Sequence, residues 1–158
     1  MEIENFEAKK CGNIITLKDK GNNKSKINLI ANNAIFYLVE FDKVCDQSHG
    51  DRCDFVLYKN DKNAVLFAET KGNDIKKSSE QILNSNKLLN KSFSNSAKYA
   101  AISYSGSPKL NTTTQTEKKK KKKNGFEGLF IKSKQLKLSY QNGKIIEIGW
   151  YKLKRFKW

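Results

Sequence analysis

Two carboxylates and one ammonium group stand at spacings that suit phosphodiester chemistry. Asp54 lies near the start of one apolar run and Glu69 closes the next, with Lys71 two positions further on. Alternate residues of a strand point to the same face, so Glu69 and Lys71 would share one face. Paired carboxylates suit a hard divalent ion, which polarises a phosphate and lowers the pKa of a bound water. The lysine would then position or deprotonate that water.

A hairpin must bring these groups together. The runs 53–58 and 64–69 are rich in strand-forming residues, and the short polar segment 59–63 between them is typical of a hairpin turn. A hairpin folded there sets Asp54 and Glu69 at the same end of the sheet. Asp74 is a suitable N-cap for a helix that runs to about Leu89, and a buried strand is expected over 98–105.

The rest of the chain completes the expected architecture. A short strand is expected at 13–17, and apolar residues at helical spacing predict a helix from Ser25 to about Glu40. Asn142-Gly143 between two alternating runs predicts a C-terminal β-hairpin. Residues 107–125 read as a basic flexible loop, because six consecutive lysines repel one another. We therefore expect a single α/β domain over 1–158, with a mixed central sheet flanked by helices.

Asp54, a fourteen-residue gap, Glu69-x-Lys71 and a following helix that carries Gln81 resemble the PD-(D/E)XK, or restriction-endonuclease-like, nuclease superfamily. The resemblance covers about residues 27–105, and it departs from the motif at Cys53, where the name has proline. It implies a restriction-endonuclease-like core in which Asp54 and Glu69 bind Mg²⁺ or Mn²⁺. It further implies that the Thr70 carbonyl joins the metal, that Gln81 orients the site or contacts phosphate, and that Glu40 completes the ligands.

The positive charge is confined to the second half of the chain. Residues 1–80 hold 13 basic and 13 acidic side chains, whereas residues 81–158 hold 18 basic and 3 acidic ones, which accounts for the net +15. Such an asymmetry favours a polyanionic partner, nucleic acid before an anionic membrane surface. The candidate phosphate-binding residues are Lys118, Lys119, Lys120, Lys121, Lys122, Lys123, Lys152, Lys154 and Arg155.

Bulk properties narrow the class of protein. A mean hydropathy of −0.72 with 11% aromatic residues is polar but globular, and the chain has no apolar run near the roughly 20 residues of a membrane-spanning helix. The N-terminus lacks the layout of a secretory signal, and three irregularly spaced cysteines make no disulfide framework. A cytoplasmic protein is the simplest expectation.

Other readings of the same residues stay open. Cys45, His49 and Cys53 supply three potential zinc ligands where a structural site needs four. Ser103 and Ser105 have no base nearby in the sequence for a serine triad. The Glu69 and Lys71 pair is also compatible with an ordinary solvated ion pair.

The hypothesis that best accounts for these residues is a metal-dependent nuclease, with DNA favoured over RNA as substrate. One alternative is a catalytically inactive nucleic-acid-binding or assembly subunit that keeps the fold, and another is a basic protein that binds an acidic protein or a membrane. A homodimer or a partner subunit is compatible with either nucleic-acid role.

Overall fold

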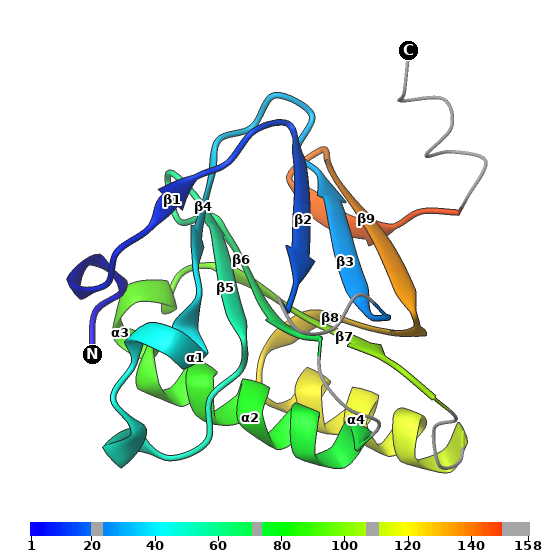
Figure 1. The fold of residues 1–158 in the computed structure, drawn as a ribbon. Helices are drawn as coiled ribbons and strands as arrows, with labels where there is room; N and C mark the ends of the chain where they lie inside the picture. The colour runs from blue at the N-terminus through cyan, green and yellow to red at the C-terminus, as the bar shows by residue number, and fades with distance from the viewer. Residues whose placement is uncertain (20–23, 71–73, 107–110, 150–158) are drawn as a thin grey trace.

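The computed structural model describes residues 1–19, 24–70, 74–106 and 111–149 (Figure 1). Its larger sheet is mixed and has the strand order β1-β4-β5-β6-β7-β8. The pairs β1/β4, β4/β5 and β5/β6 are antiparallel, and β6/β7 and β7/β8 are parallel. These strands are β1 (Lys9–Lys10), β4 (Phe36–Val39), β5 (Phe55–Lys59), β6 (Ala64–Glu69), β7 (Ala97–Tyr104) and β8 (Phe126–Ser133).

A second sheet of four strands packs against one face of the first, in the order β10-β9-β3-β2. In it β3 and β9 run parallel, and the two outer pairs are antiparallel. Its strands are β2 (Ile14–Lys18), β3 (Lys26–Ile30), β9 (Gln135–Gln141) and β10 (Lys144–Glu147).

Helices cover the opposite face of the larger sheet. The two long ones, α2 (Ile75–Leu88) and α4 (Asn111–Lys123), lie side by side below it in Figure 1 and contact each other. The shorter helical elements are the 3-10 turns Ile3–Asn5 and Gln47–His49 and the helices α1 (Phe41–Val44) and α3 (Asn90–Phe93). In the described part of the chain, no helix is long and apolar enough to cross a membrane.

Strand alternation divides the core into two clusters. Along β5 and β6, Val56, Tyr58, Val65 and Phe67 face the helices, whereas Leu57 and Leu66 belong to the cluster between the two sheets. Both faces of these strands are buried, which explains why the hairpin reads as nearly continuous apolar sequence. The position of a polar residue along β5 or β6 therefore tells whether its side chain faces the helices or the second sheet.

Several predicted elements are confirmed. β5 and β6 form the expected hairpin, and Asp74 caps α2 by accepting a hydrogen bond from the Lys77 amide at 3.0 Å. β7 follows where a buried strand was expected. β9 and β10 pair around Asn142 and Gly143, whose φ angles of 51° and 77° suit a tight hairpin turn. The chain is an α/β protein with mixed sheets flanked by helices.

The predicted helix from Ser25 to Glu40 is wrong. This segment forms β3 and β4, joined by a turn in which Asn32 and Asn33 adopt φ angles of 51° and 69°. That left-handed conformation cannot continue a helix, and asparagine tolerates it better than most residues. In β3 the buried Ile27 and Leu29 alternate with half-buried polar residues. Burial of the alternating apolar residues in the sheet therefore outweighs the preference for a helix that their spacing indicated.

The expected loop over 107–125 is also wrong for most of its length, because residues 111–123 form helix α4. Lysine is a good helix former, and cations in the last turn interact favourably with the helix dipole. The helix ends where Gly125 takes a φ of 82° and its amide donates to the Lys122 carbonyl at 3.2 Å. Residues 107–110 lie outside the described ranges.

Candidate active site

Asp54 and Glu69 occupy facing positions at one end of the β5–β6 hairpin. Phe55 pairs with Ala68, so extending the antiparallel register by one residue sets Asp54 opposite Glu69. Both follow the alternation that points Val56 and Phe67 toward the helices, and directly opposed residues have Cβ atoms about 4.5–5.5 Å apart. Their exposed fractions are 6% and 2%. The extended register thus places both residues on the helix-facing side of the sheet, and the convergence of their carboxylates stays a prediction.

Thr70 fixes the orientation of the Asp54 carboxylate. Its amide donates to Asp54 Oδ2 at 3.0 Å and its hydroxyl donates to the same oxygen at 3.2 Å. Thr70 is fully buried. The sequence resemblance assigns the Thr70 carbonyl to the metal, and that assignment stays a prediction, but the amide and hydroxyl give this residue a second role in holding Asp54.

The pKa of the Cys53 thiol is affected by the same two carboxylates. Burial raises its pKa above the ordinary range, and the charges of Glu69 and Asp54 raise it further. Both carboxylates therefore lie within electrostatic range of one side chain. Cys53 is buried and its Sγ donates to the Phe55 carbonyl at 3.4 Å, so this thiol is a core group rather than a nucleophile.

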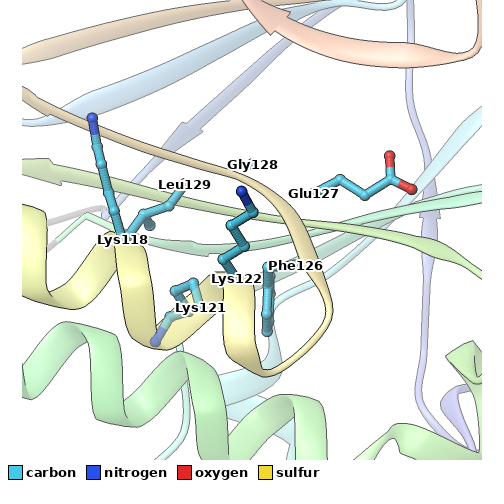
Figure 2. Close-up of a pocket in the computed structure, with 7 residues that line it drawn as sticks. All are labelled: Lys118, Lys121, Lys122, Phe126, Glu127, Gly128 and Leu129. Carbon is cyan, nitrogen blue, oxygen red and sulfur yellow. The ribbon is translucent and has the colours of Figure 1, made fainter.

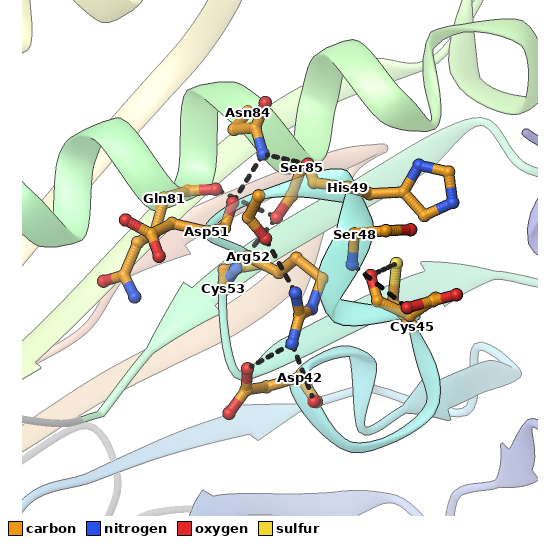
Figure 3. A network of polar contacts seen from close by, with 12 residues as sticks. Asp42, Cys45, Ser48, His49, Asp51, Arg52, Cys53, Gln81, Asn84 and Ser85 are labelled. Carbon is orange, nitrogen blue, oxygen red and sulfur yellow. Dashed lines mark hydrogen bonds and ion pairs between the residues drawn. The ribbon is translucent and has the colours of Figure 1, made fainter.

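Helix α2 holds the segment that leads into Asp54 (Figure 3). The Cys53 amide donates to Ser85 Oγ at 2.8 Å, and Ser85 Oγ donates in turn to the Gln81 carbonyl at 2.9 Å. Asn84 Nδ2 donates to the carbonyls of His49 and Asp51 at 3.2 and 2.5 Å. The helix thus binds the main chain of this segment at three residues just before Asp54.

Arg52 ties the same segment to α1 (Figure 3). Its guanidinium donates to the Gly50 carbonyl at 2.7 Å, and to the Asp42 carboxylate at 3.2 Å and carbonyl at 3.4 Å. Only 7% of Arg52 is exposed, so the ion pair with Asp42 is shielded from solvent on the arginine side. Arg52 and α2 therefore both hold the segment of the chain that precedes Asp54.

The structure does not bring Glu40 to the carboxylate pair. The β4–β5 register, extended by one residue, sets Glu40 opposite Phe55, whose side chain faces the second sheet. Glu40 lines a cavity of about 740 Å³ together with Phe55 and Leu38, and it pairs with Lys43 at 3.4 Å. The expected fourth ligand thus sits on the other face of the sheet from Asp54.

The remaining predicted residues are placed only in part. Lys71 lies outside the described residues, as do Lys152, Lys154 and Arg155. Gln81 is half-buried on α2, and its carbonyl joins the network that leads to Cys53. The role of its side chain stays a prediction.

The lysine run is not six equivalent charges. Lys121 is 1% exposed, and its ammonium donates to the carbonyl and hydroxyl oxygens of Ser79 on α2 at 2.7 and 2.5 Å. Ser79 Oγ donates to Glu117 at 2.6 Å, and Glu117 is also buried. Burial lowers the pKa of Lys121 to about 8, although Glu117 opposes that shift. Lys121 anchors α4 to α2, so the expectation that it binds nucleic acid is wrong.

The other five lysines of the run are exposed. Lys120 lies 3.6 Å from Glu117. At 100° per residue, Lys118 and Lys122 share one side of α4 and Lys119 and Lys123 share the next.

Among the described residues, no three His, Cys, Asp or Glu side chains are grouped to hold a metal ion. The assignment of Asp54 and Glu69 as metal ligands stays a prediction, and Lys71 is not placed relative to them. Cys45 is buried while His49 is exposed, and the cysteines at 11, 45 and 53 are free thiols.

Sequence reasoning missed the groups that support the site, namely Asn84, Ser85, Arg52 and the Ser79–Glu117–Lys121 cluster. One signal was available, because Ser78, Ser79 and Ser85 fall among the inward positions of α2. Serine is a weak choice for a buried helix face unless its hydroxyl has a partner.

No family model matches the chain, and no curated protein and no solved structure matches it either.

Proposed function

We propose that this chain is a metal-dependent nuclease that hydrolyses phosphodiester bonds in the cytoplasm, with DNA favoured over RNA. The observation that carries the proposal is the pair of buried carboxylates, Asp54 and Glu69, at facing positions on one face of the β5–β6 hairpin. The resemblance to the PD-(D/E)XK superfamily supports the same chemistry and implies a restriction-endonuclease-like core. The order hairpin, α2, β7 agrees with it, whereas the long helix expected before the hairpin is replaced by strands.

The donor set fits a hard divalent cation. Asp54 and Glu69 offer oxygen ligands, and carboxylates that face each other on a sheet repel unless a cation lies near both. Mg²⁺ or Mn²⁺ held there would supply Lewis-acid polarisation of the scissile phosphate. Such ions keep several waters and share their coordination with substrate phosphate, so two protein carboxylates are a sufficient anchor.

The protein side chains position these oxygens. Two hydrogen bonds from Thr70 hold the Asp54 carboxylate, and the Glu69 backbone pairs with Ile102 of β7. Lys71 lies two positions beyond Glu69, where it would stabilise charge that develops on the phosphate. Exposed lysines on α4 would hold the phosphate backbone away from the reacting bond.

The matched variants Asp54→Asn and Glu69→Gln test this proposal, because each removes one charge and keeps the side-chain shape. Purified protein is incubated with plasmid, linear DNA and RNA, with Mg²⁺, with Mn²⁺ and with chelator. Metal-dependent cleavage that both variants lose supports the proposal. Cleavage that survives in the chelator, or in Glu69→Gln, contradicts it.

A second candidate is a non-catalytic nucleic-acid-binding subunit with the same fold. The position of Glu40 on the other face favours it, because the carboxylate pair then lacks the third acidic ligand that Glu40 was expected to supply. Nucleic-acid binding without divalent-ion binding, measured by calorimetry on the wild type and Asp54→Asn, would favour this candidate over the nuclease.

A further inference from the structure

A pocket of about 430 Å³ lies between α4 and β8, the last strand of the larger sheet (Figure 2). Its volume falls in the range of small-molecule sites, roughly 300–1,000 Å³. The residues that line it are Lys118, Lys121, Lys122, Phe126, Glu127, Gly128 and Leu129.

Two of its three lysines are available to a ligand. The side chains of Lys118 and Lys122 rise on the same side of α4 in Figure 2, whereas Lys121 turns toward α2, where Ser79 binds its ammonium. This division follows from helix geometry, because Lys121 and Glu117 occupy the α2-facing side and Lys118 and Lys122 the adjoining one. The buried cluster on Ser79 thus sets the rotation of α4 that presents the pair.

The one carboxylate in the lining does not neutralise that pair. Tyr99, which belongs to the core between the two sheets, donates its hydroxyl to Glu127 Oε2 at 3.2 Å. Figure 2 shows the Glu127 carboxylate directed away from the two ammonium groups.

The other walls complement a cationic rim. Leu129 is half-buried and Phe126 is 5% exposed, so the apolar wall is small, and Gly128 contributes backbone to the lining. An edge strand also turns part of its amide groups away from its sheet. A Cβ at Gly128 would come within 3.1 Å of the Phe130 ring and 3.2 Å of the Tyr99 ring, so the core between the two sheets, and not the pocket, accounts for the glycine. Ammonium groups, backbone and a small apolar wall are the features of a site for a phosphorylated ligand with a flat or ring-shaped body.

We propose that this pocket binds the phosphomonoester of a nucleotide, as the terminal phosphate of a nucleic-acid strand. The proposal rests on the proposed function for its class of ligand. A phosphomonoester carries about −1.5 to −2 charges at pH 7, against one for an internal phosphodiester, so two ammonium groups match a strand end better than a chain interior. The nuclease would then engage strand ends through α4 and β8.

The chain provides a matched control for the test. Lys118→Gln/Lys122→Gln removes the pocket pair, and Lys119→Gln/Lys123→Gln removes two exposed lysines of the same helix at the same spacing that do not line the pocket. Both double variants lose the same charge from the same element. A difference between them therefore reports the pocket and not general attraction to a polyanion.

Binding is measured in chelator, so that no cleavage occurs, with one single-stranded sequence carrying a 5′-phosphate, a 3′-phosphate or hydroxyl ends. We expect a terminal phosphate to tighten binding by at least about threefold, from two exposed ion pairs. The pocket variant should lose this preference and the control variant should keep it. Amide resonances of Gly128 and Leu129 should shift with the phosphorylated strand and not with the hydroxyl one.

A free mononucleotide distinguishes two ligands that carry the same phosphomonoester group, namely the end of a nucleic-acid strand and a small molecule. If it shifts the same amides while strand ends make no difference, the pocket binds phosphomonoester as a small molecule and the strand-end assignment is overturned. Equal losses in both double variants, or unmoved amides with every probe, would overturn the pocket itself. Because nothing in these measurements needs hydrolysis, an absence of cleavage would count against the nuclease proposal alone.

Discussion

Replacing Lys121 with methionine tests how α4 is held. The methionine keeps the apolar stem of the buried side chain, as far as Cε, but removes an ammonium that donates to two oxygens of Ser79. Glu117 would stay buried with Ser79 and, at 3.6 Å, Lys120 as partners. Removing one member of a buried charged pair costs about 3–5 kcal/mol. Because Lys121 and Glu117 are linked through Ser79 and Lys120 stays near Glu117, we expect a loss of roughly 3 kcal/mol, at the low end of that range. For a chain of this size we expect a fall in melting temperature of about 6–12 °C.

The pH dependence gives an independent signature of the same group. Because burial depresses the pKa of Lys121 from 10.5 to about 8, the unfolded chain holds its proton more tightly than the folded one. The folded state therefore carries a penalty below about pH 8. This penalty is relieved as the pH rises from about 8 to 10.5, so this group makes the wild-type free energy of unfolding rise across that window. The Lys121→Met protein should lack this rise.

Urea unfolding of the wild type and Lys121→Met at pH 7, 8, 9 and 10, followed by circular dichroism, measures both effects. The double variant Glu117→Gln/Lys121→Met is the control, because it removes the buried negative charge as well. It should be more stable than Lys121→Met alone. A Lys121→Met protein within about 0.5 kcal/mol of the wild type at every pH would refute the assignment of Lys121 as the anchor.

Three further outcomes follow from the geometry. Thr70→Val removes one hydrogen bond to Asp54 at nearly constant side-chain volume. It should lower the catalytic efficiency about 10- to 100-fold, while the far-ultraviolet circular dichroism spectrum stays unchanged. An unchanged rate would show that Thr70 does not position Asp54. Asn84→Ala removes two hydrogen bonds to the segment before Asp54 and should cost about 1–2 kcal/mol in urea unfolding, whereas no loss would mean that α2 does not hold that segment. Changing the five exposed lysines of the run to glutamine, with Lys121 kept, should weaken binding to all DNA sequences alike and flatten its salt dependence; an unchanged slope would remove α4 from the interface.

The sequence predicted the structure best in segments whose residue pattern fits only one type of secondary structure. The β5–β6 hairpin combines strand-forming residues with a short polar turn, and Asp74 precedes the first apolar residue of α2, so both elements were predicted correctly. The position of Asp54 opposite Glu69 followed from that hairpin. Local signals and tertiary burial agree at these residues, which is the condition for reading structure from a pattern.

The failures lie where local and tertiary signals compete. Residues 25–40 fit helical spacing and strand alternation equally well, and the turn at Asn32 and Asn33 together with pairing to β2, β5 and β9 selects strands. The face on which Glu40 lies depended on that choice. In the lysine run, charge repulsion suggested a loop, but Ser79 provides a buried partner for Lys121 that no local pattern reveals.

The most direct test of the central claim is plasmid cleavage in Mg²⁺ by the wild type and Glu69→Gln, purified side by side and shown by circular dichroism to be folded. The account predicts that the wild type nicks or linearises the plasmid in Mg²⁺ and not in chelator, and that Glu69→Gln leaves it intact. Equal cleavage by the two proteins, or none by the wild type in Mg²⁺ and in Mn²⁺, would contradict it.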